Sequence, residues 1–242
     1  MYYEDYVDKN KISLQREAER KKYVKRTAII LTLIIAIIFV LSITVQTMFQ
    51  VHHVSIDGSS MYPNLVNEEK VWAAKIPWQK EYRRGEVITF NAKNVDNTTK
   101  GKSIDYVKRV IGVPGDTISY NDGDIFINGK KINQDFINKD ARENTGLEYQ
   151  NKWDLKSLVK ASQNGNNGTD SVWNKQSVKK IKANNWKIPK GMYFVLGDNR
   201  TISNDSRYYG LVSEKDIVGK VFTLNDYHRD QINNLVIEFE NN

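Results

Sequence analysis

Cysteine is absent from the 242-residue sequence, and histidine occurs only at His52, His53 and His228. Without cysteine the chain cannot form disulfides, hold a cysteine-ligated zinc ion or an iron–sulfur cluster, or use a thiol nucleophile. A three-histidine metal site would need every histidine in the chain. A mean hydropathy of −0.58 excludes a protein with many membrane spans.

Neither sign of charge dominates, because 36 Lys and Arg stand against 29 Asp and Glu, a net charge of +7. With 40% hydrophobic and 27% charged residues, the composition is that of a folded protein and excludes wholesale disorder. The length suits one domain of moderate size with an insertion. The basic balance by itself is compatible with nucleic acid, an anionic membrane surface or no specific partner.

The one long hydrophobic run lies near the N-terminus, where no charged residue occurs between Thr27 and Val51. About 20 apolar residues suffice to cross the hydrocarbon core of a bilayer as a helix. The run lacks the polar face of a globular helix and is longer than the apolar part of a cleavable signal peptide. We therefore predict an uncleaved transmembrane helix over residues 27–49.

The charges that flank this run predict its orientation. Residues 16–26 carry six basic and two acidic side chains, whereas residues 49–66 carry only Asp57. The basic side of a membrane span stays in the cytoplasm. We expect a single-pass protein of the cell membrane, with residues 1–26 as a cytoplasmic basic N-terminus and the rest of the chain extracellular. The basic run then needs no nucleic acid to explain it.

The remaining chain is predicted to be a mainly β domain, because short runs of Val, Ile, Phe and Tyr are broken by Gly, Asn and Asp. Hairpins are expected at Asn121–Asp124 and at Asn128-Gly129. The expected strands cover residues 85–90, 105–112, 117–120, 125–127, 130–132, 192–196 and 217–224.

Residues 133–187 differ from the rest of this domain, since they are polar and rich in asparagine. We predict an insertion subdomain there, between a first part of the catalytic core at 50–132 and a second part at 188–242, with a flexible tip at 162–169. Trp153, Trp173 and Trp186 are expected to anchor a small core in the insertion rather than to form a ligand cage.

Three short stretches could carry chemistry, and the first surrounds Ser60. Gly58 and Pro63 flank this serine, and such residues make a tight turn that can present a hydroxyl together with a free backbone N–H. The alternative is an ordinary polar turn.

The second stretch, residues 106–116, reads as a strand that places Lys108 on the same face as Tyr106 and Val110. Desolvation lowers the pKa of a buried lysine. A shift to about 8 costs about 3 kcal/mol, which suggests a use for the buried amine. The alternative is a lysine that packs its stem and keeps its ammonium group in water.

The third stretch, residues 197–207, follows the hydrophobic run at 193–196 and is dense in Asp, Asn, Ser and Arg. Asp205 and Arg207 could form a charge-assisted pair. The stretch is either a solvated turn or a hydrogen-bonded scaffold beside a site.

A serine nucleophile needs a base. The three histidines lie outside any motif-like setting, and a neutral lysine can replace histidine in this role. The sequence therefore offers Ser60, Lys108 and a polar loop that could orient them.

Together these stretches resemble the type I signal peptidases, the membrane-anchored Ser–Lys endopeptidases that remove signal peptides from exported preproteins. A single span followed by an outside domain is similar to the Gram-positive form. The resemblance covers residues 25–225, and the insertion is variable in the family. It implies an antiparallel β-sheet catalytic domain of the signal-peptidase type, with one N-terminal transmembrane helix and an inserted α/β or irregular subdomain. Four segments carry the resemblance: residues 58–65, 84–90, 106–116 and 197–210.

The resemblance also implies a role for each matching residue. Ser60 corresponds to the nucleophile, whose backbone N–H would hold the oxyanion, and Lys108 corresponds to the general base. Ser203 corresponds to the hydroxyl that positions the lysine amine, and Asp205 and Arg207 correspond to a structural pair. Gly58 supplies no side-chain oxyanion donor, and Asn64 and Ile202 depart from the usual residues. The remaining matches are turn residues Gly58, Met61 and Pro63, and loop residues Gly197, Asp198 and Asn199.

The implied partners are signal-peptide-bearing preproteins, bound in an extended form along a sheet edge, together with membrane lipid and the secretion machinery. No metal, cofactor or nucleic acid is implied. Two alternatives stay open. A non-catalytic relative that acts as an assembly or chaperone factor for surface structures would be expected to lack the serine or the lysine. A soluble self-cleaving repressor would need a DNA-binding domain in place of the membrane span.

Overall fold

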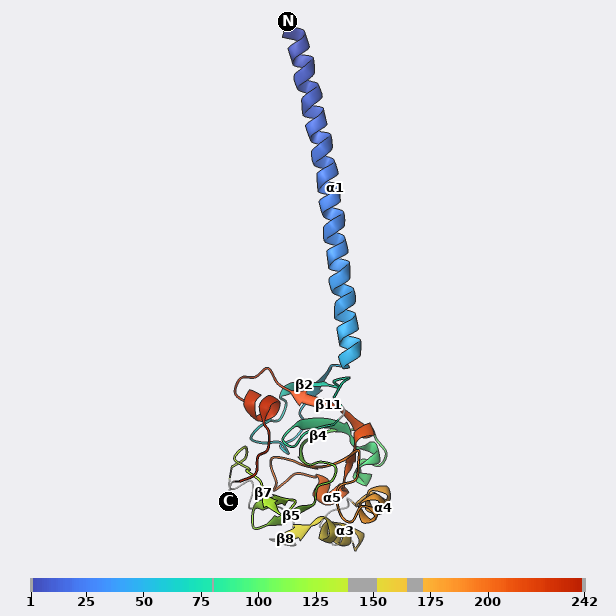
Figure 1. The fold of residues 1–242 in the computed structure, drawn as a ribbon, viewed down its shortest axis with the longest axis vertical. Coiled ribbons are helices and arrows are strands. Elements are labelled where there is room, and N and C mark those ends of the chain that lie inside the picture. The colour runs from blue at the N-terminus through green and yellow to red at the C-terminus, as the bar shows by residue number, and fades with distance from the viewer. Residues whose placement is uncertain (1, 80, 139–151, 165–171, 241–242) are drawn as a thin grey trace. The chain divides into compact units, whose positions relative to one another are not determined.

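The computed structural model describes residues 2–79, 81–138, 152–164 and 172–240, and the chain forms two compact units, Met1–Met48 and Phe49–Asn242. The first unit is one long helix, α1 (Tyr2–Phe49), and the second holds the strands and the shorter helices (Figure 1). The two units are described separately below.

Helix α1 contains the predicted apolar segment and extends it toward the N-terminus. Its part from Arg16 to Met48 is long and apolar enough to cross a membrane, and the most apolar stretch buries no residue within the protein. Along it, the hydroxyls of Thr27, Thr32 and Thr44 donate to carbonyls one turn earlier. These bonds satisfy polar groups that would have no partner in lipid.

The larger sheet of the second unit has seven antiparallel strands in the order β1-β2-β11-β3-β4-β9-β10. Strand β4 lies inside this sheet and pairs with β3 and β9, so both of its edges are hydrogen-bonded. The strands are β1 (His52–Ser55), β2 (Lys70–Ala74), β3 (Val87–Asn91), β4 (Asp105–Gly112), β9 (Met192–Leu196), β10 (Val212–Ser213) and β11 (Ile217–Phe222).

The smaller sheet has four antiparallel strands in the order β7-β6-β5-β8. The two predicted hairpins are confirmed: Asp122-Gly123 and Asn128-Gly129 have positive φ angles, as two-residue turns between right-twisted strands require. Strand β8 follows residue 133 in sequence yet pairs with β5. The strands are β5 (Ile118–Asn121), β6 (Asp124–Ile127), β7 (Lys130–Lys131) and β8 (Lys152–Asp154).

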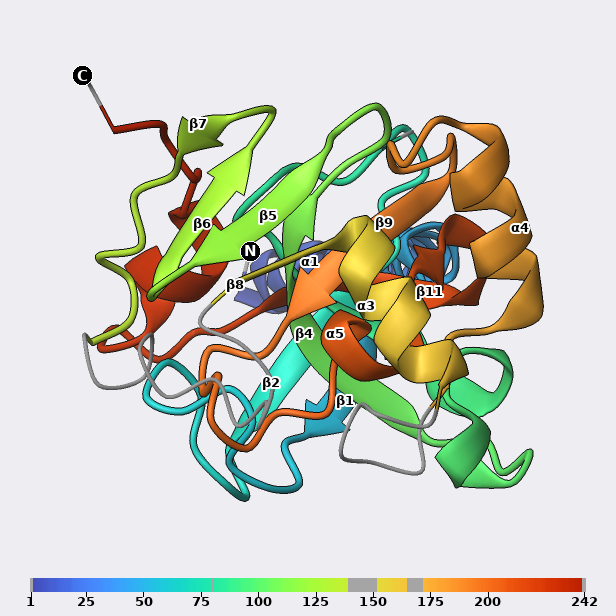
Figure 2. The same cartoon turned by 90° about the horizontal axis from the view of Figure 1, so that it is seen from below.

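Helices α3 (Leu155–Gln163) and α4 (Lys175–Ala183) lie away from the β6–β7 edge of the smaller sheet (Figure 2). Asp154 caps α3 by accepting a hydrogen bond from Ser157 N–H at 2.7 Å, while the Ser157 hydroxyl accepts from Asp154 N–H at 2.8 Å. Of the predicted flexible tip, Ser162 and Gln163 end α3, and residues 165–169 lie outside the described residues.

The shorter helical elements lie in the loops between strands, except η4, which follows the last strand, β11. They are η1 (Ala92–Asn94), η2 (Asn97–Thr99), α5 (Ser206–Tyr209), η3 (Glu214–Asp216) and η4 (Asp230–Asn234).

Buried apolar side chains form the core of the second unit around both sheets. The tryptophans are core residues as predicted, since Trp153 and Trp173 are buried and Trp186 packs against the same cluster, but this core is shared with the sheets rather than confined to the insertion. That cluster joins α3 and α4 to the smaller sheet and to β9. A separate cluster, which includes Ile56, Met61, Val87, Val107 and Val221, underlies the start of the domain and β4.

Candidate active site

The turn that carries Ser60 is fixed at both ends. Ile56 N–H donates to Glu69 at 2.9 Å, and Gly58 N–H donates to the side chain of Asn67 at 2.7 Å. Gly58 has a φ of 92°, a conformation that favours glycine. Within the turn, Met61 is buried in the apolar cluster beneath the sheet. These contacts place the Ser60 side chain at the surface of the domain on a rigid support.

The other turn residues act through packing and hydrogen bonds. The peptide bond between Tyr62 and Pro63 is cis. Asn64, which differs from the usual residue of the matching segment, is buried and donates from Nδ2 to Phe136 O at 2.7 Å and to Asp198 Oδ2 at 2.9 Å. Asn64 therefore ties the serine turn to the 197–207 loop, a role that sequence patterns did not reveal.

Lys108 lies in β4, directly opposite Ile88 of β3. Only 5% of its surface is exposed. Its Nζ atom lies 2.9 Å from Ser60 Oγ and 2.9 Å from the carbonyl oxygen of Val107. Of the two readings that the sequence left open, the structure favours the buried lysine over one that keeps its ammonium group in water.

Burial lowers the pKa of Lys108 to about 8. The carboxylates of Asp205 and Asp198 act in the opposite direction, and the Arg207 guanidinium adds to the lowering. When Lys108 is neutral, one N–H can bond to Val107 O, and the nitrogen lone pair can accept the Ser60 hydroxyl proton. The lowered pKa therefore leaves a fraction of Lys108 neutral near neutral pH, and this neutral amine can accept the Ser60 hydroxyl proton.

Gly197 lets the polar loop approach the serine turn closely. A Cβ atom at this position would overlap the Ser60 carbonyl oxygen and the Ser203 side chain. In the same place, Asn199 N–H donates to Ser60 O at 3.0 Å, and Ser203 N–H donates to Asn199 O at 3.1 Å. The loop therefore holds the backbone of Ser60 directly.

Two buried ion pairs support this loop. Arg207 donates from Nε and Nη2 to the two carboxylate oxygens of Asp205, at 2.8 and 2.9 Å. Arg109 donates in the same two-pronged way to Asp198, at 2.7 and 2.6 Å. Burial alone would raise the pKa of Asp205, but the charge and hydrogen bonds of Arg207 outweigh it and hold that pKa below its usual value.

The sequence predicted the Asp205–Arg207 pair but not the Arg109–Asp198 pair. Arg109 is fully buried, and it follows Lys108 on a strand, so its side chain points to the opposite face of β4. The sequence carried one signal for this pair: Arg109 lies inside a strand with apolar neighbours, which indicates a buried acidic partner.

Ser203 lies beside Gly197, with 2% of its surface exposed. The hydrogen bonds of Lys108 Nζ go to Ser60 and Val107, whereas the Ser203 hydroxyl acts on the Asp205 carboxylate, whose pKa it helps to lower. A role of Ser203 in positioning the lysine amine stays a prediction.

A second polar network borders the same site and was missed by the sequence analysis. The carboxylate of Asp96, which is fully buried, accepts a hydrogen bond from Tyr106 Oη at 3.1 Å and from Asn204 Nδ2 at 2.7 Å. The Lys108 amine lies 5.4 Å from the centre of the Tyr106 ring. Asp96 thus fixes two residues that flank the lysine.

A pocket of about 330 Å³ opens over Ser60 and Lys108. Its walls combine apolar Ile56 and Ile202 with polar Tyr106. Ile202, the other departure from the usual residues, has 60% of its surface exposed. Within the described part of the chain, no cluster of three or more His, Asp or Glu side chains could hold a metal ion.

Comparisons with known proteins show which family the chain belongs to. The sequence profile of signal peptidase, peptidase S26, matches residues 14–224. Signal peptidase IB of Staphylococcus aureus (strain COL) is 36% identical over 189 residues, covering 77% of this chain and 83% of that protein. Signal peptidase I P of Bacillus subtilis subsp. natto is 30% identical over 166 residues, covering 68% of this chain and 71% of that protein.

The crystal structure of a signal peptidase I from Enterococcus faecalis is 27% identical, covers 58% of this chain and 97% of its own, and superposes with a TM-score of 0.39. The profile match and the sequence relatives define the chain as a peptidase. It belongs to the signal peptidase family, peptidase S26.

Proposed function

We propose that the chain is a membrane-bound serine endopeptidase that cleaves signal peptides from exported preproteins with Ser60 as nucleophile and Lys108 as general base. The observation that supports this most directly is the 2.9 Å contact between Lys108 Nζ and Ser60 Oγ in a buried setting. Family membership supports the substrate class. Because both residues are present, the alternative of a non-catalytic assembly factor is not favoured.

The reaction begins when neutral Lys108 takes the Ser60 hydroxyl proton as Oγ attacks the scissile carbonyl carbon. The Ser60 backbone N–H donates to the resulting oxyanion, and Gly58 offers no side chain to assist. The C–N bond then breaks, and the lysine ammonium returns its proton to the leaving amine of the mature protein. The signal peptide remains as an ester on Ser60.

Hydrolysis of this ester completes the cycle. Lys108 takes a proton from a water molecule, whose oxygen attacks the ester carbonyl carbon. When the C–O bond breaks, Lys108 returns the proton to Ser60 Oγ, and the signal peptide leaves with a new carboxylate. In this scheme Asp198, Asn199, Asp205 and Arg207 act as scaffold, and Ser203 acts as a positioning residue for the lysine amine.

We further propose that α1 anchors the enzyme in the cell membrane, with residues 1–26 in the cytoplasm, 27–49 in the bilayer and 50–242 outside. The exposed apolar surface of α1 supports membrane lipid as a partner. Residues 50–132 and 188–242 would form the catalytic core, 133–187 the insertion subdomain. Contact with the secretion machinery would bring preproteins to the site.

The test is cleavage of a purified preprotein by the full chain in detergent, with N-terminal sequencing of the product. Ser60→Ala and Lys108→Ala should each reduce cleavage by several orders of magnitude, whereas circular dichroism should show folded protein. Ser103→Ala and Lys102→Ala provide matched controls, because both residues are exposed in the loop before β4. Processing at the wild-type rate by either site variant would contradict the proposal.

A further inference from the structure

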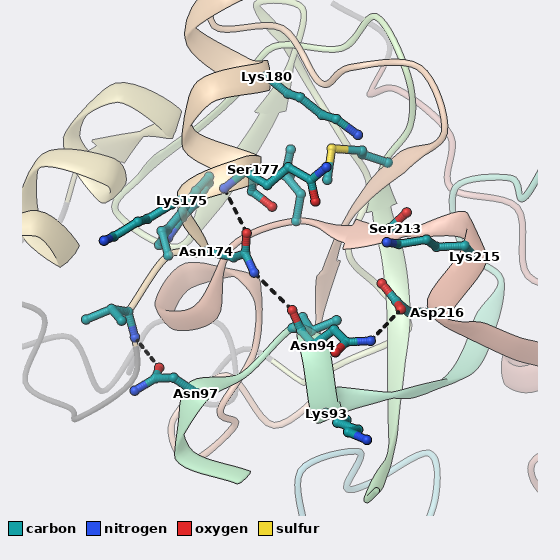
Figure 3. Close-up of a pocket in the computed structure, with 16 residues that line it drawn as sticks. Lys93, Asn94, Asn97, Asn174, Lys175, Ser177, Lys180, Ser213, Lys215 and Asp216 are labelled. Atoms are coloured by element: carbon teal, nitrogen blue, oxygen red, sulfur yellow. Dashed lines mark hydrogen bonds between the residues drawn. The ribbon is translucent and has the colours of Figure 1, made fainter. Parts of the chain in front are cut away.

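A second pocket, of about 570 Å³, lies between α4 and the segments that contain η1, η2 and η3 (Figure 3). It shares no lining residue with the pocket over Ser60 and Lys108. We refer to it as the basic pocket. It is therefore separate from the pocket proposed for the peptidase reaction.

Hydrogen bonds between distant segments build the walls of the basic pocket. Asn174 donates from Nδ2 to Asn94 O at 3.0 Å, and the backbone N–H of Val172 donates to Asn97 Oδ1 at 2.8 Å. Trp173, whose side chain is buried, lies between these two contacts in sequence and also lines the pocket. The hollow is thus a fixed part of the boundary between the predicted insertion and the core.

Lysine dominates the charge of this pocket. Among the described residues, four lysines and one aspartate line it, namely Lys93, Lys175, Lys180, Lys215 and Asp216. Residues 172–191 contain six lysines and no acidic residue, so the excess of positive charge continues beyond the rim.

The side chains of Lys180 and Lys215 extend toward the same region of the pocket, one from α4 and the other from η3, whereas those of Lys175 and Lys93 extend away from it (Figure 3). Both side chains are exposed, so their ammonium groups are free to turn toward a ligand in the pocket. An anion in this space could meet one positive charge from each wall.

We propose that the basic pocket binds a phosphorylated polyol, of the size and chemistry of glycerol phosphate. Lysine binds phosphate well as a point charge, and Lys180 and Lys215 are placed to hold it. The Asp216 carboxylate would repel a bare anion, but it can accept hydrogen bonds from hydroxyl groups. A ligand with a phosphate at one end and hydroxyls at the other satisfies both kinds of side chain.

The basic pocket is concave, as sites for small ligands of this kind are, whereas a flat charged surface is not. Its phosphate could belong to a free molecule or to the headgroup of a glycerophospholipid, since the chemistry that the pocket meets is the same. Binding at this site does not depend on the peptidase reaction, and each can fail in experiment without the other.

The test uses the full chain in detergent, titrated with glycerol 3-phosphate by calorimetry at low ionic strength, with glycerol as the uncharged control. We expect saturable binding of one molecule, which weakens as salt is added. The double variant Lys180→Gln/Lys215→Gln should weaken binding at least tenfold. The matched control Lys179→Gln/Lys190→Gln, which removes two lysines outside the lining, should change it less than twofold.

The source of the phosphate is resolved by reconstitution into nanodiscs of phosphatidylglycerol or of phosphatidylcholine. If a lipid headgroup fills the pocket, phosphatidylglycerol should abolish binding of added glycerol 3-phosphate. If the ligand is a free molecule, binding should be equal in both nanodiscs. The proposal is overturned if no saturable binding occurs in detergent, if glycerol binds as well as its phosphate, or if the two double variants lose affinity equally.

Discussion

Lys108 Nζ lies 2.9 Å from Ser60 Oγ, although 48 positions separate the two residues in the sequence. The lysine amine extends from strand β4 in the interior of a sheet, and the serine hydroxyl extends from the turn after β1. Because neither partner is on a free loop, the contact is held by the fold itself.

Activity should rise with pH as Lys108 loses its proton. Its pKa is lowered to about 8 by burial, so the reactive neutral form makes up about 1% of the enzyme two pH units below that value. We expect kcat/KM to increase about tenfold per pH unit below pH 8 and to level off above about pH 9. The measurement is a pH–rate profile on a peptide without titratable groups near the cleaved bond. An acidic optimum would exclude a lysine base.

Lys108→Met should make the folded domain more stable at pH 7 while it abolishes cleavage. The pKa of Lys108 is lowered from 10.5 to about 8 in the fold, so the unfolded chain binds more protons between these values and stability rises with pH across that window. Below pH 8 the penalty is fully present, at most about 3 kcal/mol.

Chemical unfolding of Lys108→Met and wild type at pH 7 and pH 10 measures this effect. The gain from the substitution should shrink at pH 10, where wild type has lost most of its penalty. Lost hydrogen bonds to Ser60 and Val107 will offset part of the gain. Ser60→Ala is the control, since it removes the partner hydroxyl without removing the amine. A gain that is the same at both pH values would show that the lysine is not desolvated.

Gly197→Ala should lower kcat by at least tenfold, because the new methyl group would overlap the Ser60 carbonyl and the Ser203 side chain. The loop or the serine turn must then move, and small misplacements of reacting groups are costly in rate. Gly129→Ala is the control for backbone strain alone, since a Cβ there meets no atom within 4 Å although the φ of 79° disfavours alanine; it should lower stability and leave kcat unchanged. Steady-state kinetics together with a thermal unfolding curve separates a local shift from general loss of folding; unchanged kcat would show that the contact is not needed.

Asp96→Ala should raise KM more than it lowers kcat. The change removes the acceptor that Tyr106 and Asn204 share, and both residues line the pocket over Ser60, but it leaves the Lys108–Ser60 contact in place. Loss of this buried network should also cost about 2 kcal/mol of stability. Kinetics on a preprotein-derived peptide measures the split, with exposed Asp226→Ala as control. A pure loss of kcat would place Asp96 in the chemistry instead of the pocket wall.

Local sequence patterns predicted the strands that carry the site, because β9 is a continuous apolar run and β4 is rich in Val, Ile and Tyr, the residue types that favour strands. They also predicted the hairpins at Gly123 and Gly129, where residue type alone selects the turn. Strands β1, β2, β8 and β10 were missed. Two of them are edge strands of the larger sheet, where pairing with a neighbour rather than local propensity decides the structure.

Within the site, motifs identified the two reacting residues, but not the partners that hold them. Asn64 and Asp198 are 134 positions apart, and Asp96 and Asn204 are 108 apart. No local pattern encodes such hydrogen bonds, since they exist only after the sheet has brought the loops together. The pairing of Asp205 with Arg207 could be predicted because it is local.

The burial of Lys108 also affects the protonation of the leaving group in each step that breaks a bond. A site that disfavours a charged amine makes that amine a ready base at the outset and, once it has captured a proton, an unusually strong acid. The Lys108 ammonium would therefore protonate the departing amine and the released serine readily, because losing its proton removes a buried charge. The same desolvated nitrogen can accept the proton from the nucleophile and donate it to the leaving group, and no second titratable side chain is required.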